Sequence, residues 1–266
     1  MPVASSAETY NPRVIAPAPL RLPVRVARLG LHLAWGVALA AALFPLLAEP
    51  ARQRVVVAWS RRLLKVLGVR LAAGPAPAAR GALLVCNHVS WLDVYAILAT
   101  RHVHFVSKSE VRDWPVVGWL SAKAGTLFLQ RGRRADTARV NQAMHALMQT
   151  GEWVAVFPEG TTTDGRGLKR FLPSLLQPAV SLACPVLPAA LRYRSLEGEP
   201  STAAAYIDKL SLWQSLKRIA SQPGLIVELD FAAPLAPSGH RRELARDAEQ
   251  AVAGLLGVTP EARDAA

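Results

Sequence analysis

The sequence predicts an α/β fold, with a mixed, largely parallel sheet flanked by helices and preceded by an N-terminal membrane-associated helical segment. From residue 81 onward, short apolar runs alternate with segments of helical periodicity, the pattern of a buried sheet whose strands are separated by helices. Before residue 72, an uncharged apolar run is followed by a basic amphipathic one. With 266 residues, the chain is long enough for one large domain and an appendage.

The first 48 residues differ from the rest in proline content, periodicity and charge. Residues 1–23 contain five prolines and no clear periodicity, which predicts a disordered leader. The run 29-LGLHLAWGVALAAALFPLLA-48 then has twenty residues without a formal charge. At ~1.5 Å of rise per residue, a helix of this length reaches roughly 30 Å, the thickness of a bilayer's hydrocarbon core. We expect a membrane-inserted helix; His32 and Pro45 leave a shallow or re-entrant insertion open, and a buried core helix is the alternative.

A basic amphipathic segment, 52-RQRVVVAWSRRLLKVLGVRL-71, comes next. Its cations and its apolar residues fall on different helical faces and it carries no acid, which is typical of an interfacial helix. We therefore assign residues 24–71 to membrane-inserted and interfacial helices. Arginines flank the apolar run on both sides, with more of them after it than before it, so the positive-inside rule points to a cytoplasmic C-terminal side. We expect an inner-membrane protein whose remaining domain lies on the cytoplasmic face. A helix pair that dips in and returns also fits this two-sided charge.

Net charge is +12, and residues 1–92 hold eleven Arg or Lys against two acids. A basic, apolar front end suits an anionic membrane surface, which makes membrane lipids the expected partners. The sequence shows no zinc-finger spacing and no aromatic RNA-binding signature, so we expect no nucleic-acid partner.

Residues 72–266 are predicted to form the main domain, starting with the turn-rich linker 72-AAGPAPAAR-80. The expected strands are 82–86, 103–106, 126–130, 153–157, 186–193 and 225–231, and the expected helices lie near 90–100, 115–123, 135–150, 174–183 and 240–256.

The stretch 87-NHVSWLD-93 lies between an expected strand and an expected helix, a usual place for active residues in α/β folds. Residues five apart on a continuous helix point away from each other, so His88 and Asp93 can meet only if His88 precedes the first full turn. Asp93 would then accept one imidazole N–H, and the other ring nitrogen would be a free base. The alternative is a core histidine with an unrelated helix carboxylate.

Two further stretches contain candidate binding residues. The strand-to-turn segment 157-FPEGTTTDG-165 has free backbone N–H groups that can cradle an anion, and Glu159 can orient a substrate hydroxyl or a neighbouring cation. In 128-FLQRGRR-134, Arg131 follows a strand end and can clamp a phosphate with two hydrogen bonds. The alternatives are a plain polar turn and a solvated basic turn.

Together these stretches resemble the glycerolipid acyltransferases of the lysophosphatidic acid acyltransferase type. NHVSWLD is similar to the family's N-H-x4-D motif and FLQRGRR to its block with a phosphate-binding arginine. FPEGTTTDG is similar to its F-P-E-G-T block and 185-PVLPAALRY-193 to its proline-containing fourth block. Their order and separations agree as well, and the resemblance covers roughly residues 80–195.

The resemblance implies a membrane-bound O-acyltransferase with a glycerolipid acyltransferase-like fold. His88, oriented by Asp93, would take the proton from the free hydroxyl of lysophosphatidic acid. That oxygen would attack the thioester of acyl-CoA or acyl carrier protein and give phosphatidic acid, with no acyl-enzyme. Arg131 would hold the acceptor phosphate. The residues implied to shape the acceptor site are Glu159, Gly160 and Thr161. The resemblance implies no metal and no bound cofactor.

One departure from the family's pattern concerns the acceptor. Many members read F-P-E-G-T-R, and Thr162 stands here in place of that arginine. A related branch acylates lyso-ornithine lipid, which lacks a glycerol phosphate, so this acceptor is the runner-up. A lipid hydrolase would need a nucleophile; Ser90 lies near His88, but the chain has no G-x-S-x-G elbow. His102 and His104 share a strand face, and the sequence shows no third metal ligand beside them.

Overall fold

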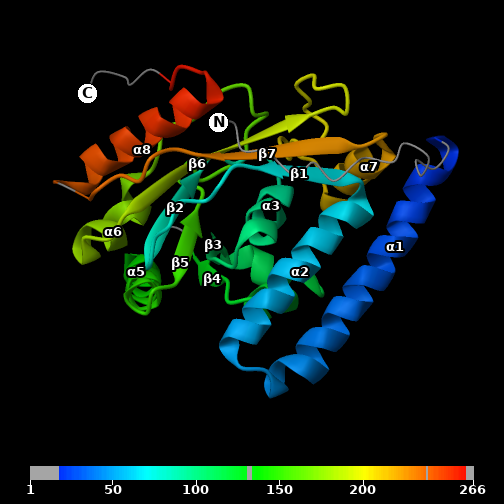
Figure 1. The fold of residues 1–266 in the computed structure, drawn as a ribbon, viewed down its shortest axis with the longest axis horizontal. Helices are drawn as coiled ribbons and strands as arrows, with labels where there is room; N and C mark the ends of the chain where they lie inside the picture. The colour runs from blue at the N-terminus through cyan, green and yellow to red at the C-terminus, as the bar shows by residue number, and fades with distance from the viewer. Residues whose placement is uncertain (1–17, 131–133, 238, 262–266) are drawn as a thin grey trace, which may run out of the picture.

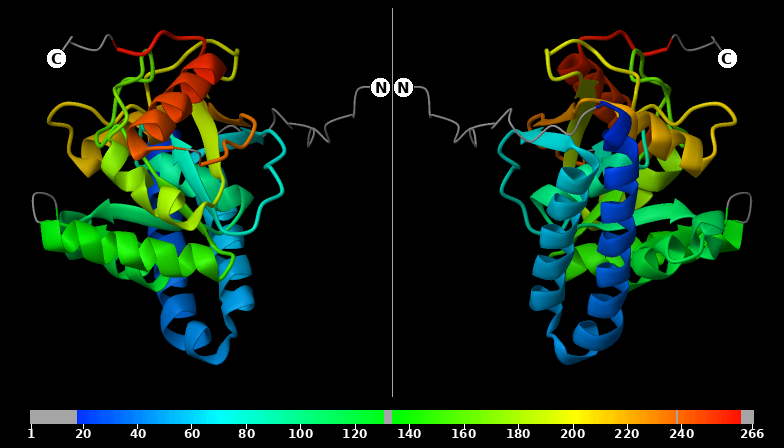
Figure 2. Two further views of the ribbon diagram at one scale, coloured as in Figure 1. Left: turned by 90° about the vertical axis from the view of Figure 1, so that its left-hand side faces the viewer. Right: turned by 90° about the vertical axis from the view of Figure 1, so that its right-hand side faces the viewer.

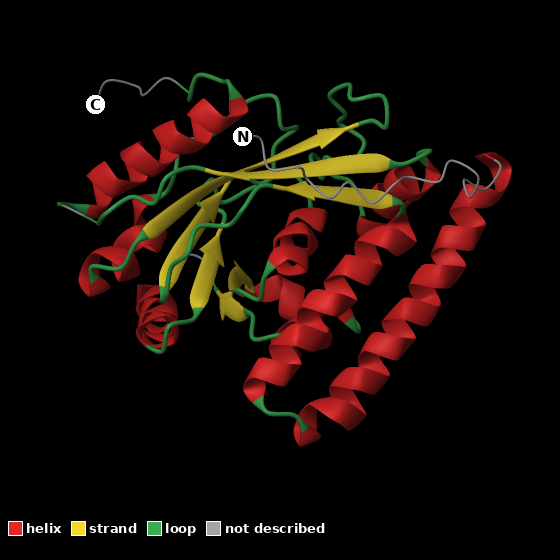
Figure 3. Cartoon of the chain, in the orientation of Figure 1, coloured by secondary structure: helices red, strands yellow, loops and turns green. Residues whose placement is uncertain are grey.

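In the described part of the chain, residues 18–130, 134–237 and 239–261 of a computed structural model, a seven-stranded sheet is covered by helices on both faces (Figures 1 and 3). Its order is β1-β7-β6-β2-β5-β3-β4, and only β6 and β7 pair antiparallel. The predicted mixed, largely parallel sheet is confirmed. The strands are β1 (Val69–Ala73), β2 (Ala82–Cys86), β3 (His104–Lys108), β4 (Leu127–Leu129), β5 (Trp153–Val156), β6 (Val186–Arg194) and β7 (Leu225–Phe231).

The helices pack against the sheet through two clusters of buried apolar side chains among the described residues. In β2, Leu84 and Cys86 belong to one cluster and Leu83 and Val85 to the other, because successive side chains of a strand point to opposite faces. Residues of α2, α3 and α7 complete the first cluster, and residues of α5, α6 and α8 the second. The helices are α1 (Ala18–Ala38), α2 (Glu49–Leu67), α3 (Leu92–Thr100), α4 (Val117–Lys123), α5 (Arg134–Gln149), α6 (Gln177–Leu182), α7 (Leu212–Ser221) and α8 (Arg241–Leu256).

Helices α1 and α2 form a hairpin that runs along the domain and extends beyond it (Figure 2). A π-helical turn, Leu39–Leu43, and a 3₁₀ turn, Phe44–Leu46, end the apolar run before the chain reverses. The His32 ring stacks on the Trp59 ring at 4.4 Å, and its Nε2 lies 3.2 Å from the Trp59 carbonyl oxygen. By length and composition the helical stretch Pro19–Leu46 could cross a membrane.

Both ends of this hairpin are attached to the domain. Near the start of α1, the Arg25 guanidinium donates to the carbonyl oxygens of Ala220, Gln222 and Pro223, at the end of α7. The far end of α2 leads into β1, which pairs with β7. The apolar helix α1 therefore reaches away from the domain, and α2 returns to it.

Three expectations about the first third of the chain need correction. Residues 18–23 of the expected leader belong to helix α1, which has Pro19 in its first turn, where a missing N–H has no partner to lose, and Pro23 in its interior. Residues 1–17 lie outside the described residues. The amphipathic helix ends at Leu67, since Gly68 adopts the left-handed conformation (φ +74°) and caps it. The next residues form β1, which crosses the expected boundary between residues 71 and 72.

Helix α7 was not predicted either. Its start carries a local signal, a capping box in which the Ser211 side chain accepts from the Gln214 N–H and the Gln214 side chain accepts from the Ser211 N–H. The apolar face of α7 packs inward, with Ser215, Ile219 and Ala220 buried.

Candidate active site

The loop between β2 and α3 begins at the carboxyl edge of the sheet and is anchored by Asn87. This side chain is fully buried, and its amide donates to the Leu191 carbonyl oxygen (3.0 Å) and accepts from the Leu191 N–H (2.7 Å). Because Leu191 belongs to β6, the bonds attach the loop to the neighbouring strand. His88, the next residue, is consequently held just past the end of β2.

His88 and Asp93 meet as the sequence analysis requires, because helix α3 starts only at Leu92. The His88 Nδ1 atom lies 2.8 Å from Asp93 Oδ2. The same oxygen accepts from the backbone N–H groups of Val89 (2.7 Å) and Ser90 (2.8 Å). Asp93 has no exposed surface, so these bonds compensate for the loss of water around a buried carboxylate.

Tyr193 supplies the remaining bond to this carboxylate. Its hydroxyl donates to Asp93 Oδ1 at 2.6 Å. Burial, followed by the nearby Asp93 carboxylate, raises the pKa of Tyr193 well above its ordinary value, so the hydroxyl stays protonated. In the sequence Tyr193 is the last residue of an expected strand, and its separation of 100 residues from Asp93 gives no signal of contact.

The other nitrogen of the His88 ring is available to a substrate. A carboxylate that accepts from Nδ1–H selects the tautomer in which Nε2 carries a lone pair. The ring stacks on Phe157 with centroids 3.9 Å apart and planes 7° apart, and 21% of the side chain is exposed. Among the described residues, no hydrogen bond to Nε2 is found. The ring is thus rigidly held and still accessible.

Glu159 supports the His88 loop from the turn after β5. Its Oε1 accepts from the His88 N–H (2.7 Å) and its Oε2 from the Lys169 N–H (3.0 Å). The side chain is 6% exposed, and burial raises the pKa of Glu159 to about 7 against the opposing effect of these two bonds. The carboxyl group of Glu159, a residue expected to shape the acceptor site, points into the protein and positions the backbone of His88.

A cleft of about 420 Å³ opens beside His88, and Gly160, Thr161 and Thr162 line it. Gly160 has φ +72°, a conformation that glycine adopts without strain. Thr162 donates its hydroxyl hydrogen to the Tyr206 carbonyl oxygen. Lys108, at the end of β3, is the one cation among the described residues that line the cleft. Arg131 lies outside the described residues.

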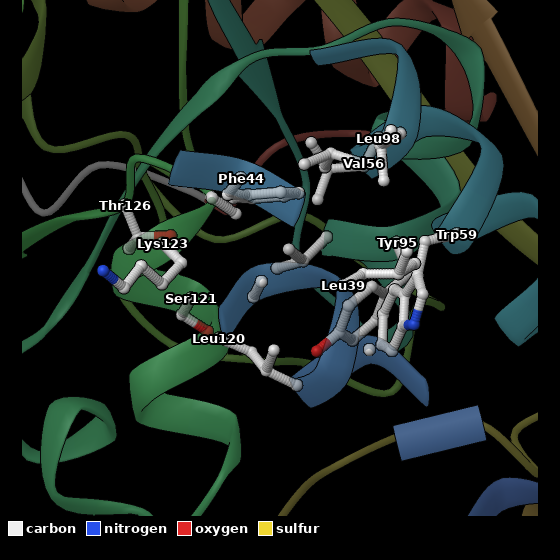
Figure 4. Close-up of a pocket in the computed structure, with 15 residues that line it drawn as sticks. Leu39, Phe44, Val56, Trp59, Tyr95, Leu98, Leu120, Ser121, Lys123 and Thr126 are labelled. Carbon is white, nitrogen blue, oxygen red and sulfur yellow. The ribbon is translucent and has the colours of Figure 1, made fainter. Parts of the chain in front are cut away.

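From His88 the cleft continues toward the helical hairpin. It shares Trp59, Tyr95 and Ser121 with a smaller chamber of about 70 Å³ between the hairpin, α3 and α4 (Figure 4). Leu39, Phe44, Val56, Leu98 and Leu120 make most of this chamber apolar, and Ser121, Lys123 and Thr126 lie at its α4 side.

Ser90 is not placed as a nucleophile. It is fully buried, and its hydroxyl oxygen accepts from the Leu92 N–H at the start of α3. The structure therefore does not offer Ser90 as a nucleophile at the exposed face of His88.

Comparison with known proteins identifies the family. The family model described as Acyltransferase matches residues 72–192. A lyso-ornithine lipid O-acyltransferase from Pseudomonas aeruginosa is 39% identical over 241 residues, which cover 88% of this chain and 92% of that protein. The chain belongs to the lysophospholipid acyltransferase family.

Other members of the lysophospholipid acyltransferase family support the assignment. A 1-acyl-sn-glycerol-3-phosphate acyltransferase from Neisseria gonorrhoeae is 36% identical over 77% of this chain and 82% of that protein. The crystal structure of the 1-acyl-sn-glycerophosphate acyltransferase from Thermotoga maritima superposes with a TM-score of 0.60 at 22% identity, covering 88% of this chain and 96% of that one, which shows a shared fold. This acyltransferase is thus an enzyme related to enzymes of phospholipid and lysolipid metabolism, and its apolar N-terminal helix indicates membrane association.

Proposed function

We propose that this acyltransferase moves a fatty acyl group from a thioester, acyl-CoA or acyl carrier protein, to the free hydroxyl of a lysolipid. The observation that carries the proposal is the His88 ring, with Nδ1 on Asp93 and Nε2 facing an open cleft. Nε2 takes the proton of the acceptor hydroxyl while its oxygen attacks the thioester carbonyl. The new C–O bond forms, the C–S bond breaks, and the thiolate leaves with the proton that His88 had taken.

The surroundings of His88 support direct transfer without an acyl-enzyme. Asp93 stabilises the imidazolium that forms during attack, and its four donors keep its charge in place. The stacked Phe157 ring covers one face of the imidazole. The chemistry of this proposal needs no cofactor and no metal.

The apolar chamber of Figure 4 supports a binding mode for the acyl chain. It continues the cleft away from His88 and ends among side chains of the hairpin, α3 and α4. A fatty acyl chain whose carbonyl lies beside His88 can extend along this apolar path and bury its methylenes, each stabilising the complex by about 0.8 kcal/mol.

For the acceptor, lysophosphatidic acid is the first candidate, and phosphatidic acid is then the product. It rests on the similarity of FLQRGRR to the phosphate-binding block, with Arg131 as the phosphate ligand. The second candidate is lyso-ornithine lipid, the acceptor named for the Pseudomonas aeruginosa relative. Thr162 favours it, because a neutral hydroxyl bonded to Tyr206 lines the cleft where many members carry an arginine.

A lipid-product assay tests the reaction and separates the two acceptors. The purified full-length protein is offered each lysolipid with each donor, acyl-CoA and acyl carrier protein, and the products are identified by mass spectrometry. We expect a diacylated lipid from one acceptor and a rate at least about 100-fold lower from His88→Ala. His145 lies on α5, away from the cleft, and His145→Ala should turn over at the wild-type rate. Release of free fatty acid without acceptor acylation would instead identify a hydrolase.

We also propose that the protein lies on the cytoplasmic face of the inner membrane with the hairpin dipping into one leaflet. Support comes from the attachment of both hairpin ends to the domain, and from apolar side chains exposed along α1 and at the turn, including Leu31 (73% exposed) and Leu46 (81%). Burying one such leucine in lipid stabilises the bound state by about 1.5–3 kcal/mol.

Flotation with lipid vesicles tests the dipping hairpin. Leu31→Glu and Leu46→Glu should each lower the vesicle-bound fraction, with a partition coefficient at least about 10-fold smaller. Leu172→Glu is the matched control, since Leu172 is 48% exposed beside the Pro173–Leu176 turn of the domain. Equal partitioning of all three variants would contradict insertion of the hairpin.

A further inference from the structure

A second cluster of chemically active side chains lies at the amino ends of the parallel strands, whereas His88 lies at their carboxyl ends. It consists of His102, just before β3, His104, the first residue of β3, and Glu152, just before β5. One possible ligand atom from each lies within 4.8 Å of the other two. Because β3 and β5 are parallel, their amino ends meet here and their carboxyl ends meet at the active site.

The hydrogen bonds of the two histidines leave one lone pair on each ring. The His104 Nδ1 atom lies 3.0 Å from the Gly125 carbonyl oxygen and His102 Nε2 lies 3.3 Å from that of Ala124. A carbonyl can only accept, so these nitrogens carry the protons, and His104 Nε2 and His102 Nδ1 carry the lone pairs. An imidazole oriented by a backbone carbonyl in this way is the usual arrangement of a metal-ligating histidine.

Within the described part of the chain, the two lone-pair nitrogens and the Glu152 carboxylate are incompletely paired, as the ligand atoms of a cation site would be. His102 Nδ1 is buried and has no hydrogen-bond partner among the described residues. His104 Nε2 lies 3.8 Å from Glu152 Oε2, longer than a hydrogen bond, while Glu152 Oε1 accepts from the Gln53 amide at 3.1 Å. The nearby Arg101 guanidinium stacks on the Trp153 ring at 3.9 Å instead of pairing with Glu152. A buried, unpaired nitrogen beside a carboxylate is the arrangement that a bound cation stabilises.

We propose that His102, His104 and Glu152 bind a divalent transition-metal ion, with Zn²⁺ as the expected metal. Two imidazoles and one carboxylate are a ligand set that zinc accepts, with water in the fourth position. Ligand atoms around a tetrahedral zinc lie about 3.4 Å apart, so the cluster contracts slightly on binding. The third ligand is not evident in the sequence, because Glu152 is far along the chain and reaches the histidines only through the pairing of β3 with β5.

The position of this site gives it a structural role. Through Gln53 it is linked to α2, and through Ala124 and Gly125 to the turn between α4 and β4. That turn admits only glycine at residue 125, where φ is +83° and a Cβ would lie 2.5 Å from His104 Nδ1. Ala124 and Thr126 line the apolar chamber, so a bound ion would hold one wall of the chamber against the hairpin.

Metal titration of the untagged full-length protein in detergent micelles tests the proposal. After removal of metal with a chelator, Zn²⁺ should bind at one per chain in competition with a chromophoric chelator, and Co²⁺ should give the visible absorption of a four- or five-coordinate ion. At free zinc 100 times the dissociation constant, the melting temperature should rise by about 5 °C or more.

The variants His104→Gln and Glu152→Gln should lose more than about 100-fold in zinc affinity and show no thermal shift, since each lacks a direct ligand. Glu152→Gln is the decisive one, because it keeps its size and its bond from Gln53 and leaves both rings intact. The matched controls His145→Gln and Glu197→Gln, on α5 and in an exposed loop, should bind as wild type does. Equal zinc affinity in wild type and Glu152→Gln would overturn the site.

Discussion

Replacing Asp93 with asparagine removes its negative charge and keeps the geometry of its hydrogen bond with His88. Asp93 Oδ2 receives three donors, from His88 Nδ1 and two backbone N–H groups, and Oδ1 receives the Tyr193 hydroxyl. The asparagine carbonyl oxygen takes the place of Oδ2, because three donors point at it. The amide NH₂ then faces Tyr193, whose hydroxyl can rotate and accept. The fold and the His88 tautomer are therefore retained, and the negative charge is lost.

The expected size of this effect follows from the distance between the two groups. His88 Nδ1 and Asp93 Oδ2 are 2.8 Å apart, and Asp93 is fully buried. With the charge centres about 4 Å apart and an effective dielectric constant of about 20, the carboxylate stabilises an imidazolium by about 4 kcal/mol. Loss of that amount in the transition state lowers kcat about 1,000-fold.

Initial rates of thiol release from acyl-CoA, measured with a thiol-reactive dye, check this value. We expect Asp93→Asn to keep the KM for the donor within about threefold of wild type, and to unfold with about 1–3 kcal/mol less free energy because one acceptor is lost. In the double variant with His88→Ala, the second change should add almost nothing, since the two residues act as one unit. A folded Asp93→Asn enzyme with kcat within about fivefold of wild type would refute the assigned role of Asp93.

His88→Ala should lower kcat at least 100-fold, in the range of about 10²–10⁴ typical of general bases, while binding to vesicles persists; substantial turnover by the purified variant would remove the base assignment. Burial raises the pKa of Glu159 to about 7 from 4.5, so between these pH values the native state holds a proton that the unfolded chain has released. The free energy of unfolding should therefore fall by about 3 kcal/mol as pH rises through this window, a fall that urea titrations of Glu159→Gln should not show. Arg131→Ala should raise the KM for a phosphate-bearing acceptor, and an unchanged KM would point to another head group. Tyr193→Phe should lower the free energy of unfolding by about 1 kcal/mol in denaturant melts; a loss near zero would mean that its bond to Asp93 contributes nothing.

Local patterns were sufficient for much of the fold. The strands at 82–86 and 225–231 were predicted with the bounds that the structure shows, because short apolar runs between turn residues are typical of buried strands. Strand β1 was missed, since its helix-like periodicity continues that of α2. Only Gly68 and the pairing of Val69 with Leu225, far along the chain, make this segment a strand.

The sequence by itself determined that the chain alternates strands and helices behind an apolar, basic front end, and that His88 and Asp93 flank a strand-to-helix junction. These features depend on neighbours a few residues apart, which is why they can be read from one chain. Tertiary structure decided the directions of the side chains. Tyr193 turns to Asp93, Glu159 turns inward to the backbone of His88, and Glu152 turns to His102 and His104. Each direction depends on which strands become neighbours, because strand pairing brings together groups that are distant along the chain.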